Sequence, residues 1–407
     1  MDSQRRFDWW LAGLCLARTS GALVFINYAA ALPLLRVEWG MSAAAAGSIS
    51  TGFNIGYAVS LVVLSSLADY FGPKRIYLVS ITAATCFSLA FALFARDYHS
   101  GLILYSLVGI SMGGTYTTGL MILAHRYPPL KRGMASGFFI AATSMGYALS
   151  LVISGLTLPV GGYRLSFLIT GLGTLASLGL SAAVLRGVST PKPATRQRGG
   201  FSGEVLRNKP AMLLIAGYTF HNFELLGMWA WTPAFLAAVL AVDGLEGLQA
   251  AGMGSYLNAF FHFMGLVASF SMGMLSDRLG RARVLFWLAL ASAVTSLFYG
   301  FTFGASLYLV VGLGMFFAFT GLGDSPVLSA GLTEATSPAY LGAAFGLRSL
   351  LGFGAGAIAP LVFGAVLDAT QGGSAAVGWG LAYLSLGLSG LGAAGSALAY
   401  GRIRRRA

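Results

Sequence analysis

Long, almost uncharged apolar runs are the feature that most constrains this 407-residue sequence. A helix needs about 20 apolar residues to cross a bilayer. Twelve runs of about that length follow one another: 9–34, 43–67, 76–94, 101–124, 135–158, 165–185, 211–239, 253–275, 284–303, 306–332, 343–367 and 377–400. With 57% hydrophobic and only 9% charged residues, the chain cannot cover a soluble globule with a solvated surface. The sequence therefore predicts an all-α polytopic membrane protein with twelve transmembrane helices.

The basic residues are distributed asymmetrically between the gaps. The net charge of +12 would suit a nucleic-acid partner only if these residues shared one surface, and they do not. If the amino terminus is cytoplasmic, 20 of the 25 lysines and arginines fall in the gaps and ends on the cytoplasmic side. Loops rich in these residues stay in the cytoplasm. We expect a multi-pass protein of the inner (cytoplasmic) membrane with both termini cytoplasmic and no nucleic-acid partner.

The longest gap, residues 186–210, lies near the middle of the chain and contains prolines, glycines and six basic residues. Such a composition is typical of an interdomain linker. We therefore predict an N-terminal six-helix bundle over residues 1–185, a basic cytoplasmic linker over 186–210, and a C-terminal six-helix bundle over 211–407. Two related halves should also carry an internal repeat.

A repeat is found where the second and third runs of each half meet. Residues 65–75 (SSLADYFGPKR) match residues 273–283 (GMLSDRLGRAR) at an offset of 208. We expect each aspartate to end a helix beside a cationic loop and each glycine to permit the tight reversal that follows. Such a latch would hold the cytoplasmic side shut, whereas the alternative is a loop of solvated charges. The predicted gating residues are Asp69, Gly72 and Arg75 in the first copy and Asp277, Arg278, Gly280 and Arg281 in the second.

The second copy resembles the loop signature of the major facilitator superfamily (MFS), in which a glycine, an Asp-Arg pair, a second glycine and a basic cluster follow in order. The first copy departs from it at Ser65 and Tyr70, and residues 126–137 are similar to the family's loop between spans four and five. The resemblance covers the whole chain. It implies two pseudo-symmetric six-helix bundles that transport a solute by alternating access, and no enzymatic activity. The sequence holds no phosphate-binding Gly-Lys-Ser/Thr loop, which favours coupling to an ion gradient or to exchange.

Four ionisable residues inside the apolar runs are functional candidates by default, because a charge in the bilayer is costly. They are Arg18, Glu224, Asp324 and Arg348. The resemblance implies that all four could face a central cavity. We expect Arg18 to bind a carboxylate or similar oxyanion through its planar fork of donors, with Arg348 as a second candidate. The alternatives are that Arg18 pairs with Glu224 or Asp324, and that Asp324 pairs with Arg348.

Glu224 is the leading candidate for proton coupling, because an apolar environment raises the pKa of a carboxyl group. His221 lies one turn before it on the same helical face, so the two side chains could interact directly. A lone histidine in a span is more often a packing residue. Asp324 is a further candidate for the proton site.

Polar and aromatic residues within the runs are secondary candidates for substrate binding. At the repeat offset of 208, Asn54 corresponds to His262, which suggests matching positions in one cavity. Tryptophans at span ends are more often interface anchors. The remaining members of this set are Asn27, Tyr116, Asn258, Trp229 and Trp231.

Two functions fit these residues. The leading prediction is a proton-coupled symporter or exchanger of a small organic or inorganic anion. The alternative is a proton-driven efflux antiporter for lipophilic or cationic compounds, although residues 146–155 lack the Gly-Pro pair of the antiporter signature. We expect a monomer in the lipid bilayer that uses no cofactor or metal. Its partners would be a small-molecule substrate and a proton or counter-substrate.

Overall fold

The structure is a computed structural model that describes residues 8–188, 203–337 and 340–405. Within these ranges every regular element is a helix. The linker predicted over 186–210 lies largely outside the described residues. The elements are α1 (Trp9–Gly21), η1 (Ala22–Val24), α2 (Asn27–Glu38), α3 (Ala43–Phe71), α4 (Pro73–Phe94), α5 (Tyr98–Arg126), α6 (Pro129–Val184), α7 (Gly203–Arg207), α8 (Lys209–Val242), α9 (Gly247–Leu279), α10 (Arg281–Tyr299), η2 (Gly300–Thr302), α11 (Leu307–Ala335), α12 (Leu341–Ala369) and α13 (Ala375–Arg404).

The described residues form eleven long apolar helices but twelve membrane crossings, because α6 is long enough to cross twice. Its 56 residues include a break at Gly161 and Gly162, where the backbone leaves helical geometry. The Ser166 hydroxyl donates to the Ser154 hydroxyl at 3.0 Å. Because twelve residues of straight helix would span about 18 Å, the chain must turn back at the break. The predicted count of twelve spans is confirmed.

The first span is also interrupted, near its middle. Residues Trp9–Glu38 cross once, but the helix changes to the 3-10 form at Ala22–Val24 before α2 begins. Neighbouring spans satisfy carbonyls that the break frees: the Val24 carbonyl accepts from the Tyr105 hydroxyl at 3.1 Å, and the Leu23 carbonyl accepts from the Ser150 hydroxyl at 2.6 Å. Such compensation allows irregular backbone at membrane depth. The break places Arg18 and Phe25 on either side of the middle of the molecule.

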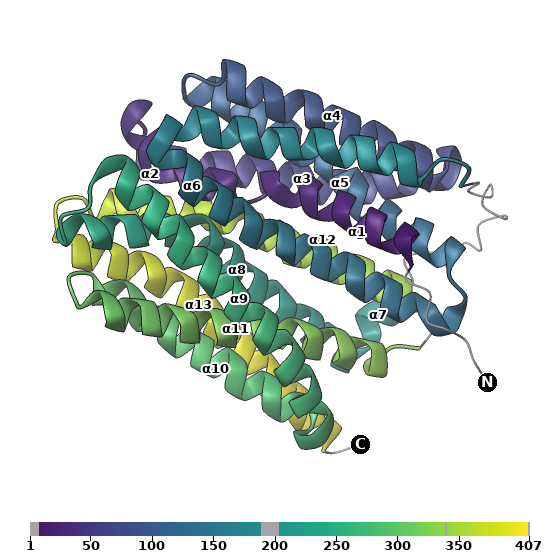
Figure 1. Cartoon of the computed structure of the whole chain (residues 1–407). Coiled ribbons are helices and arrows are strands. Elements are labelled where there is room, and N and C mark those ends of the chain that lie inside the picture. The colour runs from purple at the N-terminus through teal and green to yellow at the C-terminus, as the bar shows by residue number, and fades with distance from the viewer. Residues whose placement is uncertain (1–7, 189–202, 338–339, 406–407) are drawn as a thin grey trace.

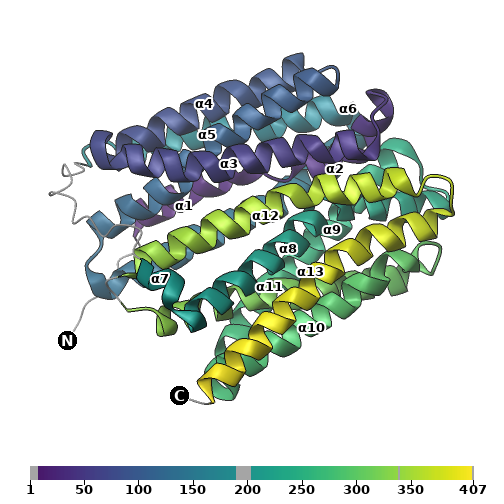
Figure 2. The ribbon, with the colours of Figure 1, turned by 180° about the vertical axis from the view of Figure 1, so that it is seen from behind.

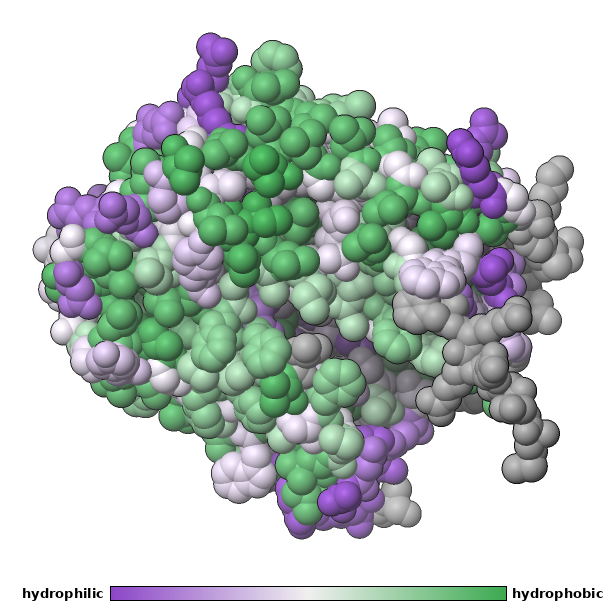
Figure 3. Space-filling view, viewed as in Figure 1, coloured by the Kyte–Doolittle hydropathy of each residue, from purple (hydrophilic) through white to green (hydrophobic). Residues whose placement is uncertain are grey.

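The helices form two bundles, α1–α6 and α8–α13, that lie side by side (Figures 1 and 2). Both chain ends lie at one end of the molecule, which we call the terminal face, and the opposite end is the distal face. Apolar side chains cover much of the lateral surface between the two faces (Figure 3). A surface of this kind suits contact with lipid tails.

The two bundles meet closely at the distal face. The Asp368 carboxylate of α12 accepts from the backbone N–H groups of Ala43 and Ala44 at the start of α3, at 2.8 and 2.7 Å. Gly47 lies so near the Pro360 carbonyl that a Cβ would stand 2.2 Å from that oxygen. By contrast, glycines near the terminal ends of α6 and α12 face open space; they are Gly133, Gly137, Gly342 and Gly346. Close contact between the bundles is therefore seen at the distal face, where the start of α3 meets the end of α12.

Candidate functional site

Arg18 is a buried guanidinium that has no acidic partner among the described residues. It lies in the last turn of α1, just before the break, and its side chain is only 2% exposed. Its Nε donates to the Thr143 hydroxyl and its Nη1 donates to the Thr115 hydroxyl, both at 2.8 Å. Its Nη2 is sealed from solvent and has no hydrogen-bond partner. The expected alternative, an ion pair with Glu224 or Asp324, is not formed. Arg18 therefore holds a full positive charge and a free donor.

The second bundle also holds a buried arginine, Arg348 of α12. It is 8% exposed, its Nη1 donates to the Ser329 hydroxyl at 2.8 Å, and its Nε has no partner. Its guanidinium lies over the Tyr218 ring, 3.7 Å from the centroid, a favourable cation–π geometry. The predicted ion pair with Asp324 is wrong, because Asp324 turns to a different partner. Each half thus contributes one buried, unneutralised cation.

Both cations border the same space between the bundles. Tyr116 interacts electrostatically with Arg18 from its own bundle and with Arg348 from the other. Tyr57 likewise interacts with Arg18 and with Tyr218. Distal to these groups lies a cavity of about 70 Å³ lined mainly by aromatic rings from both bundles, which we call the central chamber. Its lining is Phe25, Ile26, Ala29, Ser50, Phe53, Asn54, Tyr57, Tyr105, Tyr147, Leu226, Trp229, Ala230 and Phe353.

The buried acids belong to the interior of the second bundle instead. The Glu224 carboxylate accepts from the Ser292 hydroxyl of α10 at 3.1 Å, and its other oxygen lies against Gly390 of α13. Asp324 pairs with His221, with 3.0 Å between Oδ2 and Nδ1, and its Oδ1 is buried without a partner. The expectation that the acids line the central cavity with the arginines is therefore wrong for the central chamber.

His221 interacts with different groups from those predicted. Its Nδ1 faces Asp324 and its Nε2 shares a hydrogen bond with the Ser325 hydroxyl at 3.1 Å. Both ring nitrogens thus contact residues of α11, so His221 does not make the expected direct contact with Glu224. His221 and Glu224 are three residues apart, but their rotamers direct them to different neighbouring helices.

The secondary candidates separate into two groups. Asn54 and Trp229 line the central chamber, and the Tyr116 ring lies 5.4 Å from the Arg18 guanidinium. Asn27 donates to the Thr170 hydroxyl at 2.9 Å inside the first bundle. Trp231 is fully buried, donates to the Pro360 carbonyl at 2.9 Å and stacks on Phe363. Asn27 and Trp231 are thus placed as packing residues outside the central chamber. His262 contacts the rings of the lining residues Tyr147 and Trp229, and Asn258 lies one turn before it on α9.

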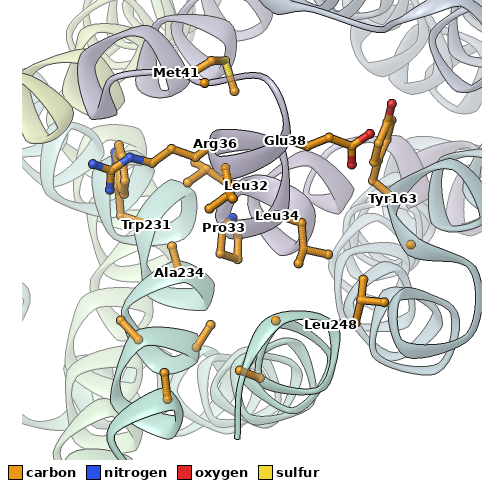
Figure 4. Close-up of a pocket in the computed structure, with 18 of the residues that line it drawn as sticks. Leu32, Pro33, Leu34, Arg36, Glu38, Met41, Tyr163, Trp231, Ala234 and Leu248 are labelled. Atoms are coloured by element: carbon orange, nitrogen blue, oxygen red, sulfur yellow. The ribbon is translucent and has the colours of Figure 1, made fainter.

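Trp231 also lines a separate, larger pocket of about 770 Å³ at the distal face (Figure 4). Its walls come from the end of α2, the break in α6, and the distal parts of α8 and α9. Figure 4 shows Arg36 and Glu38 directed to opposite sides, with Arg36 toward Trp231 and Glu38 beside Tyr163. The lining is mostly apolar.

The two predicted latches have the same backbone but different side-chain contacts. Gly72 joins α3 to α4 with φ +86°, and Gly280 joins α9 to α10 with φ +88°, a conformation that favours glycine. Arg281 pairs with Asp277 at 2.5 Å and with Glu334 at 3.0 Å. In the first copy, Asp69 and Arg75 form no ion pair within the described ranges, and neither does Arg278 in the second. The latch network therefore stays inside the second bundle and does not bridge the two.

Several residues of these contacts were not apparent from the sequence. Glu334 is part of the latch network and also pairs with Arg404 at 3.3 Å. Asp368 joins the bundles at the distal face, although a single acid near a span end carries no sequence signal for such a contact. Thr115 and Thr143 hold Arg18, but threonine is common in membrane helices and neither position stood out.

Comparisons with known proteins agree with this architecture. A sequence model of the Major Facilitator Superfamily matches residues 14–269, which is more than half of the chain. The gallate transporter of Pseudomonas putida is 28% identical, with 92% of this chain and 87% of that protein covered. The probable sulfoacetate transporter SauU of Cupriavidus necator is 26% identical, with 88% and 87% covered. A bacterial homolog of the human lysosomal transporter Spinster, solved inward-facing and unoccupied, superposes with a TM-score of 0.77 at 19% identity over 97% of this chain and 98% of that one.

Proposed function

Because this chain belongs to the major facilitator superfamily, we propose that it is a secondary transporter that carries a small organic or inorganic anion across the inner membrane by alternating access. Both termini and the linker over 186–210 would lie in the cytoplasm, so the terminal face would be the cytoplasmic face. The protein would act as a monomer of two bundles, residues 1–185 and 211–407, that rock about the central chamber.

The observation that carries the proposal is the unneutralised charge of Arg18, which is 2% exposed and keeps one donor free. A buried cation without a counter-charge costs several kcal/mol. An anion in the chamber would remove much of that cost through charge-assisted hydrogen bonds. Arg348, a buried cation of the second bundle, also supports an anionic substrate. The named substrate of one relative, gallate, is a carboxylate and also supports an anion.

Proton coupling is the second part of the proposal. Glu224 is buried, four per cent exposed, and has a hydroxyl as its hydrogen-bond donor rather than a cation. Such a carboxyl is suited to bind and release a proton. Because Glu224 contacts α10 and α13 rather than the chamber, its proton would act on the packing of the second bundle and not directly on the substrate.

Efflux of cationic compounds is less well supported. That function would need acids in the chamber, whereas Glu224 and Asp324 point into the second bundle and no acid is found in the chamber lining of the described residues. The nearest charge is that of Arg18, whose guanidinium lies 5.9 Å from the ring of the lining residue Phe25. Like charges would repel a cation at this position.

The test is anion counterflow in proteoliposomes with purified protein and a pool of labelled carboxylates. We expect the substitution Arg18→Gln to reduce counterflow at least tenfold, because it removes at least one charge-assisted hydrogen bond to the anion. Arg96→Gln, which removes an exposed charge outside the spans, is the matched control. Anion counterflow that survives Arg18→Gln unchanged would overturn the proposal.

A further inference from the structure

Three buried polar groups without partners gather beside the central chamber. The Trp229 Nε1, the Asn258 Nδ2 and the His262 Nε2 are each sealed from solvent and each lack a hydrogen-bond partner. Asn258 is only 2% exposed. Buried polar groups are nearly always hydrogen-bonded, because leaving one unpaired costs about 1–3 kcal/mol. Three unpaired groups in one place indicate a site that something else completes.

The three groups share one location. Asn258 and His262 lie four residues apart on α9 and so occupy the same helical face. The Trp229 ring of α8 lies 5.3 Å from the His262 ring. Tyr147 of the first bundle packs against both rings, at 5.6 Å from Trp229 and 6.3 Å from His262. The cluster therefore spans the contact between the two bundles.

Tyr147 connects this cluster to the cation. Its ring lies 5.3 Å from that of Phe25, which in turn lies 5.9 Å from the Arg18 guanidinium, and it also contacts Trp229 and His262. Tyr147 and Trp229 both line the central chamber. A small anion held by Arg18 in the central chamber would thus extend toward the three unpaired groups.

The chemistry of the cluster is polar but neutral. The indole N–H of Trp229 can only donate, whereas the Asn258 amide and a neutral His262 imidazole can each donate or accept. The ring neighbours of His262 are Trp229 and Tyr147, neither of which carries a positive charge. A second carboxylate placed here would be desolvated without a counter-charge. A hydroxyl or carbonyl oxygen would find both donors and acceptors.

We propose that Trp229, Asn258 and His262 form a second subsite that binds a neutral polar substituent of the transported anion. The preferred substrates are then monoanions with a hydroxyl or carbonyl group at the end opposite the charge, and not dianions. This inference rests on the proposed anion transport and names the substrate class for the same chamber.

Binding to the purified full-length transporter tests the subsite, with benzoate, 3-hydroxybenzoate, 4-hydroxybenzoate and terephthalate as probes. A site built to hydrogen-bond a hydroxyl discriminates against the analogue that lacks it. We expect at least one hydroxybenzoate to bind about tenfold more tightly than benzoate, and the dianion terephthalate to bind more weakly than that hydroxybenzoate. Asn258→Leu and His262→Phe should each bring hydroxybenzoate affinity down to that of benzoate, with benzoate affinity kept within about threefold.

Ser255→Ala is the matched control, because this buried hydroxyl of α9 is already satisfied by the Ala251 carbonyl at 2.8 Å. It should leave the discrimination intact, and the thermal stability of every variant shows that it folds. Equal binding of benzoate and both hydroxybenzoates by the wild type, or discrimination that survives both α9 substitutions, overturns the subsite while Arg18 still binds anions. Absence of binding of all four probes by the wild type also overturns the subsite, whereas benzoate binding that persists in Arg18→Gln overturns the anion proposal itself.

Discussion

A guanidinium is a useful anion ligand only if it is held in place, and two threonines do this for Arg18. Their hydroxyls accept from Nε and Nη1 and leave Nη2 free. Both acceptors are uncharged, so they orient the fork of donors without neutralising it. A carboxylate in the position of Thr115 or Thr143 would orient the arginine equally well, but it would neutralise the positive charge that binds the substrate.

Replacing Thr143 by valine keeps the shape of this residue and removes the acceptor for Nε. We expect the KM for anion uptake to rise about fivefold to tenfold while the maximal rate falls less, since the charge remains but its orientation loosens. Uptake assays in proteoliposomes measure this, with Thr82→Val as the control, because Thr82 is exposed and bonds only to its own helix. An unchanged KM would show that Arg18 needs no such support.

The isolated carboxyl of Glu224 leads to a different prediction. Glutamine at this position resembles the protonated acid and cannot release a proton, so Glu224→Gln should abolish uptake driven by a pH gradient and retain counterflow. The control is Glu246→Gln, an exposed acid at the start of α9. If the variant still accumulates substrate against a gradient, the proton site lies elsewhere, with the Asp324–His221 pair as the next candidate.

At the scale of the elements, the break in α6 is the point where one helix becomes two spans. Gly162 has φ +62°, and a methyl group added at its Cα would have no neighbour closer than 4.0 Å, so an alanine would have room but a strained backbone. We expect Gly162→Ala to cost about 1 kcal/mol of stability, seen as a lower melting temperature in detergent. Gly179→Ala, in a helical part of α6 with open space, should be neutral or slightly stabilising. Equal melting temperatures for the two variants would contradict a strained backbone at the break.

The sequence predicts elements better than it predicts contacts. Twelve spans, the glycine turns at Gly72 and Gly280, and the buried arginines follow from local composition and from one repeat, so the sequence alone was enough to predict them. The 3-10 break at Ala22–Val24 carries no proline and could not be predicted. Nor could the partners of the buried acids, because His221 has Glu224 three residues away in sequence but meets Asp324 in space.

For the molecule as a whole, alternating access requires the distal contacts to break while the terminal halves close. The first-bundle latch is unpaired and the second pairs only within its own bundle, so the described latch residues do not hold the terminal face. The distal face is held instead by close glycine contacts and by Asp368 at the start of α3. Since ligand-independent contacts set the resting equilibrium, the distal face is where a substitution should shift it most.

Asp368 is the clearest single target at this scale. Its carboxylate accepts two backbone N–H groups and lies at the positive end of the α3 dipole, an arrangement worth about 1.5–3 kcal/mol. If most of this free energy is lost when the distal side opens, Asp368→Ala should favour the distally open state by about tenfold to a hundredfold.

Cysteine labelling measures this shift. A cysteine placed at Ser50, which lines the central chamber, reports the change in a background where Cys15 and Cys86 are replaced by serine. An impermeant maleimide added outside cells should label Ser50→Cys faster once Asp368 is alanine, whereas Asp243→Ala, an exposed distal acid, should leave the rate unchanged. Equal labelling rates would mean that the glycine contacts alone hold the distal face closed.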